Sequence, residues 1–394
     1  MKKLLMASAA LSLVAGAAAA EEVKIGVVAA FTGPLESLAP PIADGHELAL
    51  KEASDSGLFL GGSTITTIRG DSTCVDAAAA TAVVERLVTS DRVSGVLGPM
   101  CSGATGAVVT NVAVPNGVVA ISASATSPAL SDIADNGLFF RTAPSDARQG
   151  DVMADIILEK GIQSVAVTYT NNDYGKGLSD AFVSAYSAKG GKVTLTAAHE
   201  DGKADYSAEV GALASAGGDA LVVVGYVDQG GAGVIQASLD TGAFDTFVFP
   251  DGMVSDTLTE RFGSDIDGSF GQNPASAGEG REIFTAMAEA AGFDGTSAFS
   301  AEAYDAGALM VLAMQAAGSS DPQVYKTKMM EVANAPGEPI LPGELAKALE
   351  ILAAGGDVDY VGASSIELIG PGESAGSYRE VAFEGGEMKV VGYR

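Results

Sequence analysis

The sequence predicts an α/β fold of two lobes, each built around a mostly parallel sheet, and three observations support this prediction. Short β-rich apolar runs alternate with helix-length amphipathic stretches, which is the pattern of successive βαβ units. The same rhythm starts again after about residue 139. The chain has 394 residues, more than the ~250–300 residues that a single hydrophobic core usually organises. We therefore expect two separate cores.

The first twenty residues predict an export signal. Two early lysines, an apolar run and a row of alanines precede Glu21, which is the layout of a secretory signal peptide cut after Ala20. The apolar run is short for a membrane anchor, and no later stretch reaches the ~18 unbroken apolar residues of a spanning helix. We therefore assign residues 1–20 to a signal peptide and expect an exported, soluble mature chain without membrane insertion.

The first half of the chain predicts four strands with helices between them. The strands read VKIGVVAAF (23–31), TITTIRGD (64–71), VSGVLGP (93–99) and GVVAISASA (117–125). Helices are expected over residues 41–57, 75–91 and 103–113. Gly57 marks the end of the first helix, because glycine commonly follows the last helical residue.

The second half repeats this arrangement. FFRTAPSDARQG (139–150) predicts a strand that runs into a connection. The strands expected after it are QSVAVTYT (163–170), KVTLTAAHE (192–200), ALVVVGY (220–226) and TFVFPDG (246–252). Continuous valine-rich strands are typical of a sheet covered on both faces by helices.

The C-terminal part predicts helices followed by a hairpin. Residues 278–335 and 343–354 have helical character, and residues 379–394 predict two strands with a turn at Gly385–Gly386. Helices this late must pack on one of the two sheets, so we expect the chain to cross between the lobes more than once. We place the first lobe at residues 21–142 and about 272–365, and the second at 143–271 and about 366–394.

Charge and missing motifs argue against several classes of function. Asp and Glu number 50 against 22 Lys and Arg, and this net charge of −28 repels phosphate backbones, so we expect no nucleic-acid partner. No nucleotide-binding P-loop and no G-x-S-x-G nucleophile motif occurs. The only histidines, His46 and His199, do not form a metal-ligand cluster. We expect no metal, no cofactor and no catalysis, with an exported carboxylate-based enzyme as an alternative.

The two cysteines allow three interpretations. Cys101 lies in the stretch LGPMCSG, directly after a predicted strand, and Cys74 is the only other cysteine. A reactive thiol, a metal ligand and a disulfide are all possible for such a pair. Export to an oxidising compartment favours a disulfide, and a metal site would require more ligands than the chain offers nearby.

Polar residues follow several predicted strands, at the sheet edge where open α/β sheets bind ligands. In the first half these residues are Ser102, Ser124 and Thr126, whose hydroxyls suit a carboxylate. Helix capping is the simpler explanation for the same residues. In the second half, strands end near Tyr174, Tyr226 and Asp251, which could form an acid between two aromatic walls.

Asp251 has its own alternative explanation. It lies in Pro-Asp-Gly, a common turn sequence, so a turn role competes with a ligand role. As a ligand residue, a buried acid would need a partner such as an ammonium group.

The order and spacing of the following motifs resemble the periplasmic solute-binding proteins of ABC transporters for branched-chain amino acids, the leucine/isoleucine/valine-binding family. The motifs are VKIGVVAAFTGP, GDSTCVDAAAATAV, GVLGPMCSGAT, AISASATSPALS, FFRTAPSDARQGDVMADIILEKG, VTYTNNDYGKGL, DYSAEVGAL and VFPDG. The resemblance extends from about residue 22 to the C-terminus. It implies a type I periplasmic binding protein fold, in which three crossovers join two Rossmann-like lobes and the ligand lies in the cleft between them.

The resemblance also implies roles for individual residues. It pairs Cys74 with Cys101 in a disulfide. The hydroxyls of Ser102 and Thr126 would hold the ligand's α-carboxylate, while the backbone carbonyl of Ser124 and the carboxylate of Asp251 would hold its ammonium. Tyr174 and Tyr226 would line the cleft.

Two positions depart from the family pattern. Leu38 stands where an aromatic residue often covers the ligand side chain, and Ala301 stands where relatives can carry a bulky residue. Both changes are expected to enlarge or reshape the side-chain pocket. Asp251 is also shorter than the glutamate of many relatives.

The function implied is that of a monomeric periplasmic receptor. It would bind an amino acid, branched-chain or a similar zwitterion, and deliver it to the membrane permease of an ABC importer. The alternatives are the same fold with another small solute, such as an amide, carboxylate, aromatic acid or betaine, and a sensory ligand receptor.

Overall fold

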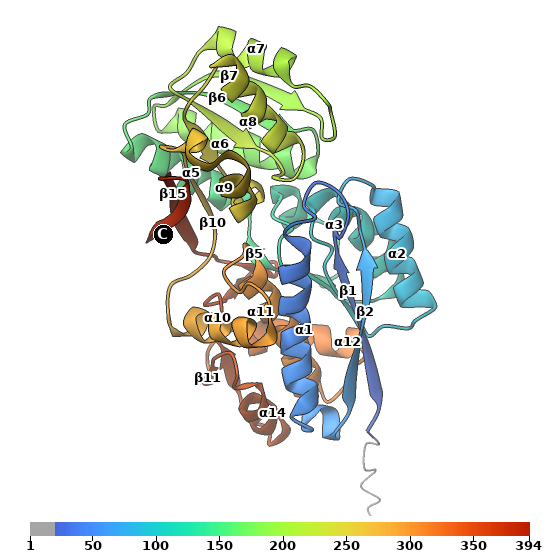
Figure 1. Cartoon of the computed structure of the whole chain (residues 1–394). Helices are drawn as coiled ribbons and strands as arrows, with labels where there is room; N and C mark the ends of the chain where they lie inside the picture. The colour runs from blue at the N-terminus through green and yellow to red at the C-terminus, as the bar shows by residue number, and fades with distance from the viewer. Residues whose placement is uncertain (1–19) are drawn as a thin grey trace, which may run out of the picture.

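The computed structural model describes residues 20–394, and the predicted signal peptide lies outside these residues except for Ala20. Figure 1 shows two α/β lobes, one above the other. The lower lobe combines the N-terminal part of the chain with helices from the last third, and the upper lobe contains the middle of the chain and its C-terminus. The predicted two-lobed α/β fold is confirmed.

The first lobe is built on a seven-stranded sheet in the order β13-β14-β5-β4-β3-β1-β2. Its strands are β1 (Glu22–Ala29), β2 (Thr64–Asp71), β3 (Gly95–Leu97), β4 (Ala120–Ser122), β5 (Phe139–Pro144), β13 (Leu368–Ile369) and β14 (Glu373–Ser374). Its helices are α1 (Ala39–Asp55), α2 (Ala77–Thr89), α3 (Ser102–Val108), α4 (Val114–Asn116), α10 (Glu279–Ala291), α11 (Ser300–Ala317), α12 (Pro322–Tyr325), α13 (Met329–Val332) and α14 (Leu345–Ala353). A small parallel pair, β11 (Glu338–Ile340) and β12 (Val358–Tyr360), completes this lobe.

The second lobe repeats the design, with a seven-stranded sheet in the order β16-β15-β10-β9-β8-β6-β7. Its strands are β6 (Ser164–Thr170), β7 (Lys192–His199), β8 (Ala220–Val224), β9 (Phe247–Phe249), β10 (Phe270–Pro274), β15 (Tyr378–Glu384) and β16 (Glu387–Tyr393). Its helices are α5 (Asp146–Glu159), α6 (Asp173–Ala188), α7 (Ser207–Ala216), α8 (Gly230–Thr241) and α9 (Asp256–Phe262). β15 and β16 form the predicted C-terminal hairpin.

Both sheets contain the same topological switch point. β1 pairs in parallel with both β2 and β3, and β6 pairs in parallel with both β7 and β8. The chain therefore leaves neighbouring strands toward opposite faces of the sheet, which opens a crevice beyond their carboxyl ends. Every residue of β8 is buried, as its valine-rich sequence predicts for a strand covered on both faces.

The chain passes between the two sheets three times. It leaves the first sheet after β5, returns after β10 and leaves again after β14. The first sheet therefore continues to Ser374, beyond the boundary near residue 365 that the sequence suggested. β13 and β14 contain only two residues each, too few to produce the alternating pattern by which strands are recognised.

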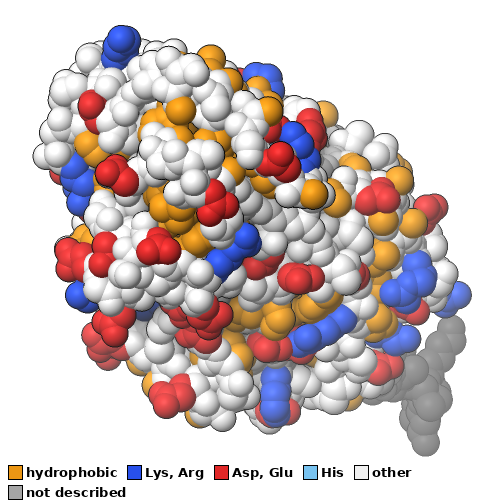
Figure 2. Space-filling view, turned by 45° about the horizontal axis from the view of Figure 1, so that its top comes forward, with side chains coloured by type: hydrophobic (Ala, Val, Ile, Leu, Met, Phe, Trp, Pro, Cys, Tyr) orange, Lys and Arg blue, Asp and Glu red, His pale blue; other side chains and the backbone are white. Residues whose placement is uncertain are grey.

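The surface agrees with the dispersed acidic composition. On the face shown in Figure 2, acidic side chains are scattered over both lobes, with fewer basic ones between them. Among residues 20–394, no helix is both long and apolar enough to cross a membrane.

Candidate functional site

A disulfide ties together the loops that follow β2 and β3. Cys74 and Cys101 are bonded, with their Cα atoms 5.2 Å apart, so the disulfide interpretation is confirmed. The loop after β3 begins at Gly98, whose φ of +112° is a conformation that favours glycine. A Cβ atom at Gly98 would lie 2.0 Å from the carbonyl oxygen of Val28, so only glycine fits between β1 and this loop.

Hydroxyl groups hold the loops after β3 and β4 together. The Oγ atom of Ser102 accepts a hydrogen bond from the N–H of Ser127 (3.1 Å). Ser124 Oγ donates to the carbonyl of Met100 (3.1 Å). The first lobe thus presents a rigid polar edge at the carboxyl ends of β3 and β4.

An acid and two tyrosines face this edge from the second lobe. Tyr174 lies in the first turn of α6, and its hydroxyl donates to Asp251 Oδ1 (2.5 Å). The N–H of Gly252 also donates to Asp251 Oδ1 (2.9 Å). The rings of Tyr174 and Tyr226 stack with centroids 5.2 Å apart and planes 10° from parallel. Asp251 is therefore held in a fixed position against an aromatic wall.

Five of the six predicted ligand residues line one cavity between the lobes. They are Ser102, Ser124, Tyr174, Tyr226 and Asp251. The other lining residues are mainly apolar: Leu35, Leu38, Met100, Cys101, Gly252 and Phe299. The cavity measures about 20 Å³ in this conformation, which is room for about one water molecule. The lobes must therefore separate before an amino acid can enter.

Thr126, the sixth predicted residue, lies behind this cavity. It is fully buried, and its hydroxyl has no hydrogen-bond partner within the part of the chain that the structure describes. Leu38 lines the cavity as expected, but Ala301 is buried inside α11 and does not reach it. Phe299, just before α11, lines the cavity instead and supplies an aromatic wall that the sequence prediction missed.

Burial changes the acid chemistry of Asp251. Its side chain is only 2% exposed, and burial raises its pKa to about 6. The hydrogen bonds from Tyr174 and Gly252 act in the opposite direction, because they stabilise the carboxylate. A cationic group in the cavity would favour the charged form further.

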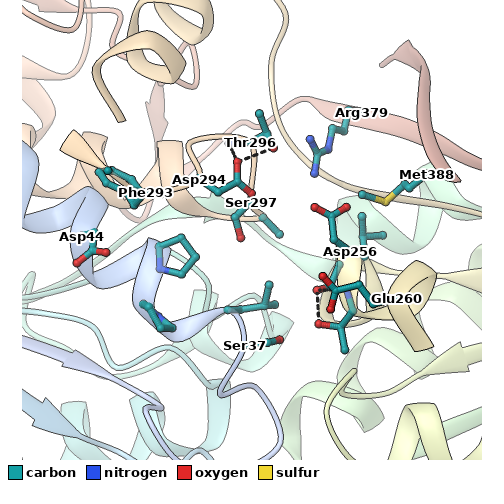
Figure 3. A pocket seen from close by; sticks show the side chains of 18 residues that line it. Ser37, Asp44, Asp256, Glu260, Phe293, Asp294, Thr296, Ser297, Arg379 and Met388 are labelled. Atoms are coloured by element: carbon teal, nitrogen blue, oxygen red, sulfur yellow. Dashed lines mark hydrogen bonds between the residues drawn. The ribbon is translucent and has the colours of Figure 1, made fainter. Parts of the chain in front are cut away.

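A larger groove lies beside the cavity, also between the lobes. Its volume is about 400 Å³, and Leu38 lines both spaces. Figure 3 shows side chains of both lobes around it, with Asp44, Phe293 and Asp294 from the first lobe and Asp256, Glu260, Arg379 and Met388 from the second. Sequence reasoning did not find this groove, because its residues come from four distant segments without a common motif.

Direct hydrogen bonds join the rims of the lobes. Asp228 Oδ2 accepts from the N–H of Ser37 (2.8 Å), and the N–H of Asp228 donates to the carbonyl of Pro34 (3.2 Å). Ser127 Oγ donates to the carbonyl of Asp173 (3.1 Å). The arrangement can therefore enclose a small molecule, with hydroxyls on one side and a carboxylate with aromatic rings on the other.

Comparison with known proteins shows similarity over most of the chain. A family model for periplasmic binding proteins matches residues 22–345. The Leu/Ile/Val-binding protein homolog 1 of Brucella melitensis is 30% identical over 339 residues, which cover 84% of this chain and 89% of that protein.

Solved structures show the same fold. A leucine binding protein from Thermotoga maritima superposes with a TM-score of 0.79 at 21% identity, covering 94% of this chain and 98% of that one. A branched-chain amino acid transporter substrate binding protein from Streptococcus pneumoniae, in complex with isoleucine, gives a TM-score of 0.75 at 23% identity, covering 94% of this chain and 99% of that one.

Proposed function

Because this chain belongs to the family of periplasmic binding proteins, we propose that it binds an amino acid, branched-chain or similarly zwitterionic, between its lobes. In this proposal it acts in the periplasm as a monomer and delivers the solute to the membrane permease of an ABC importer. The ligand bridges the two lobes, so it stabilises the closed state in which both sets of contacts exist.

One observation carries the proposal: hydroxyls of the first lobe and a fixed carboxylate of the second lobe line a single interlobe cavity. Ser102 and Thr126 would bind the α-carboxylate. Asp251 and the backbone carbonyl of Ser124 would bind the ammonium group, and the stacked tyrosines would cover it from the second lobe. The carboxylate of the zwitterion would then bind mainly to the first lobe, and its ammonium group would bind the carboxylate of the second lobe.

An apolar wall supports an aliphatic ligand side chain. Leu35, Leu38, Met100 and Phe299 line the cavity next to the polar residues. The names of the relatives point in the same direction, since one is a Leu/Ile/Val-binding protein homolog and another was solved with isoleucine.

A thermal-shift screen of the purified mature chain tests this function. The panel contains the L-amino acids together with betaines, amides and aromatic acids. A ligand at 100 times its Kd should stabilise the fold by ~2.7 kcal/mol, which is readily measured. We expect the shift with aliphatic L-amino acids, and we expect Asp251→Ala to abolish it and Ser102→Ala to reduce it.

Asp180→Ala is the matched control, since Asp180 is an exposed aspartate of α6, the helix that carries Tyr174. This variant should keep the full shift. Stabilisation by another solute class, with no response to any amino acid, would contradict the amino-acid assignment and identify a different transport substrate.

A further inference from the structure

Asp146 is a buried carboxyl for which the fold alone supplies no partner. It is the first residue of α5, its side chain is fully buried, and both Oδ atoms lack a hydrogen-bond partner among residues 20–394. Its backbone N–H donates to the carbonyl of Thr126 (2.8 Å), which joins the start of α5 to the loop after β4. A carboxyl in this position is costly unless something pairs with it.

Other unpaired polar groups surround this carboxyl. The Thr126 hydroxyl lies close enough to stabilise the Asp146 carboxylate, yet it forms no hydrogen bond of normal geometry. The amide of Gln149, one turn along α5, is fully buried and equally unpaired within the described chain. Gln149 also faces Asp251, so these polar groups form one cluster directly behind the proposed ammonium site.

Among residues 20–394, no basic side chain forms an ion pair with Asp146 or Asp251. Arg141 acts on the Asp146 carboxyl, but its Nη2 atom donates to Glu373 Oε2 (2.6 Å) and to Ser131 Oγ (2.7 Å). Its Nη1 atom donates to the carbonyls of Ala125 (3.1 Å) and Ser127 (2.9 Å). The charge of Arg141 is thus shared mainly with Glu373.

Burial and the charge of Asp251 raise the pKa of Asp146 well above its ordinary value, while Thr126 and Arg141 oppose this change. The charged and titratable groups that face the pair from the surrounding elements are Arg141 of β5, Tyr174 of α6, Tyr226 after β8 and Tyr378 of β15, while Arg148 of α5 is exposed and acts on Tyr378. Burial raises the pKa values of all three tyrosines, so their phenols stay neutral and add no charge to the pair.

We propose that Asp146 is the second carboxyl of the ammonium site: from behind the cavity it acts with Asp251 on the ligand's ammonium group, in exchange for a proton that this pair of carboxyls holds in the free protein. This inference rests on the proposed function for the identity of the cation. The balance is simple, because the ammonium keeps its own protons and donates hydrogen bonds, while one carboxyl proton leaves to solvent. Ligands with a primary ammonium are then favoured over quaternary betaines, which cannot donate.

Calorimetry with L-leucine tests the exchange. Titrations at pH 7 in two buffers of different ionisation enthalpy report the number of protons released. The wild type should release protons as leucine binds, because the ammonium lowers the pKa of the pair. Asp146→Asn should abolish the release and weaken binding about ten-fold or more. Unchanged affinity and unchanged proton release in Asp146→Asn would overturn the proposal.

Glu302→Gln is the matched control for this titration. Glu302 is also a fully buried carboxyl, and burial raises its pKa to about 7, but the charges that act on it come from Arg281, Asp305 and Arg379. Its replacement should leave the leucine-linked proton release unchanged. If Glu302→Gln also abolished the proton release, the proton would not come specifically from the Asp146 and Asp251 pair. That result would contradict the role of Asp146.

A second measurement tests the carboxyl pair without any ligand. Unfolding midpoints of wild type, Asp146→Asn, Asp251→Asn and the double variant are compared between pH 5 and pH 8. A raised folded-state pKa stabilises the protein at low pH, and this contribution is lost as pH rises through it. From pH 5 to pH 8, the unfolding midpoint of the wild type should therefore fall more than that of Asp146→Asn. The corresponding difference between Asp251→Asn and the double variant should be smaller.

The two measurements separate the possible failures. Parallel pH profiles for wild type and Asp146→Asn would overturn the shared proton. If the wild type binds no amino acid but its pH profile differs from that of Asp146→Asn as expected, the proposed function is wrong. The interaction between the two buried carboxyls would still be supported. Asp251→Asn provides an independent test should Asp146→Asn fold poorly, because removing the charge of Asp251 lowers the pKa of Asp146 and should make the pH profile less steep than that of wild type.

Discussion

The hydroxyl of Ser102 serves the fold and the proposed site at once. Its Oγ atom accepts from Ser127 N–H and also lines the cavity. Ser102→Ala should lower the free energy of unfolding by about 1 kcal/mol, since a buried N–H loses its acceptor. We also expect it to weaken amino-acid binding by about ten-fold or more, because a hydrogen bond to a charged ligand group is worth about 1.5–3 kcal/mol.

Ser124→Ala is the comparison for that variant. The Ser124 hydroxyl is used within the first lobe, on Met100, and only its backbone carbonyl is assigned to the ligand. Urea unfolding and calorimetry of both variants check the assignment. A greater loss of affinity in Ser124→Ala than in Ser102→Ala would contradict these roles.

Glu302 gives a prediction about pH and stability. Burial raises its pKa to about 7, and one carboxylate oxygen has no partner within residues 20–394. Its protonated form stabilises the fold fully below the unfolded value near 4.5, and this contribution disappears as pH rises through about 7. Glu302→Gln should therefore match wild type near pH 4.5 and exceed it by about 2–3 kcal/mol at pH 8.5.

Urea denaturation at the two pH values measures this difference. The exposed Glu289 on α10 supplies the control variant Glu289→Gln, which should leave the pH profile of wild type unchanged. A constant difference between wild type and Glu302→Gln at all pH values would show that Glu302 is ionised in the fold.

Asp251 and Asp146 show which site residues can be predicted from the sequence and which cannot. Asp251 was recognised because it follows a strand and matches a motif. Asp146 lies in Pro-Ser-Asp at the start of a helix, and the Ser145 side chain caps that helix. An acid in a first helical turn is so commonly a capping or dipole residue that nothing in the sequence distinguishes it. Its unusual burial depends on distant segments that meet at the start of α5, among them the loop after β4 with Thr126 and the turn with Asp251.

At the scale of elements, the turn after β3 depends on Gly98. Its positive φ and its contact with the carbonyl of Val28 leave no room for a side chain. Gly98→Ala should destabilise the protein by about 3 kcal/mol or more, through both backbone strain and the clash. Gly137→Ala is the control, because Gly137 also has a positive φ but a Cβ atom there would meet no neighbour within 4 Å.

The control should lose only about 1 kcal/mol, the conformational part of the effect. Denaturant midpoints of the two variants measure the difference. Equal losses would mean that the loop moves away from β1 without cost, so that close packing at Gly98 is not required.

Elements were predictable where their pattern was long. Strands β1 to β9, the main helices and the C-terminal hairpin follow from periodicity and turn residues, whereas β10 of the second sheet was not predicted. β13 and β14 were not predicted either, although Glu373 of β14 binds Arg141 beneath the site. Such short strands form because a neighbouring strand offers its edge, and that neighbour is more than 200 residues away. The cavity volume and the groove beside it depend likewise on how closely the lobes meet.

For the whole molecule, the contact of the lobes governs access to the cavity. Asp228 links the rims through its side chain to Ser37. Asp228→Ala should shift the ligand-free protein toward an open state, with a larger radius of gyration in X-ray scattering. Loss of one hydrogen bond of about 1 kcal/mol corresponds to a roughly five-fold change in the ratio of open to closed forms. Asp228→Asn retains an acceptor oxygen and should scatter like wild type.

The binding of L-leucine should reverse that change, since the ligand rejoins the lobes. Identical radii for Asp228→Ala and wild type would show that this rim contact does not influence closure. A larger radius that persists with saturating ligand would indicate damage to the lobes themselves.

The three passages between the sheets lie side by side. β14 pairs with β5 at Ser374 and Pro144, β15 pairs with β10 at Tyr378 and Pro274, and the N–H of Ala275 donates to the carbonyl of Ser377 (3.0 Å). The three connecting segments thus form one hydrogen-bonded ribbon. We expect it to bend like a hinge, because bending keeps these hydrogen bonds, whereas twisting would break them. The lobes should therefore open and close by rotation without sliding past one another. A partner could then distinguish the ligand-bound protein from the free protein by one quantity, the angle between the two lobes.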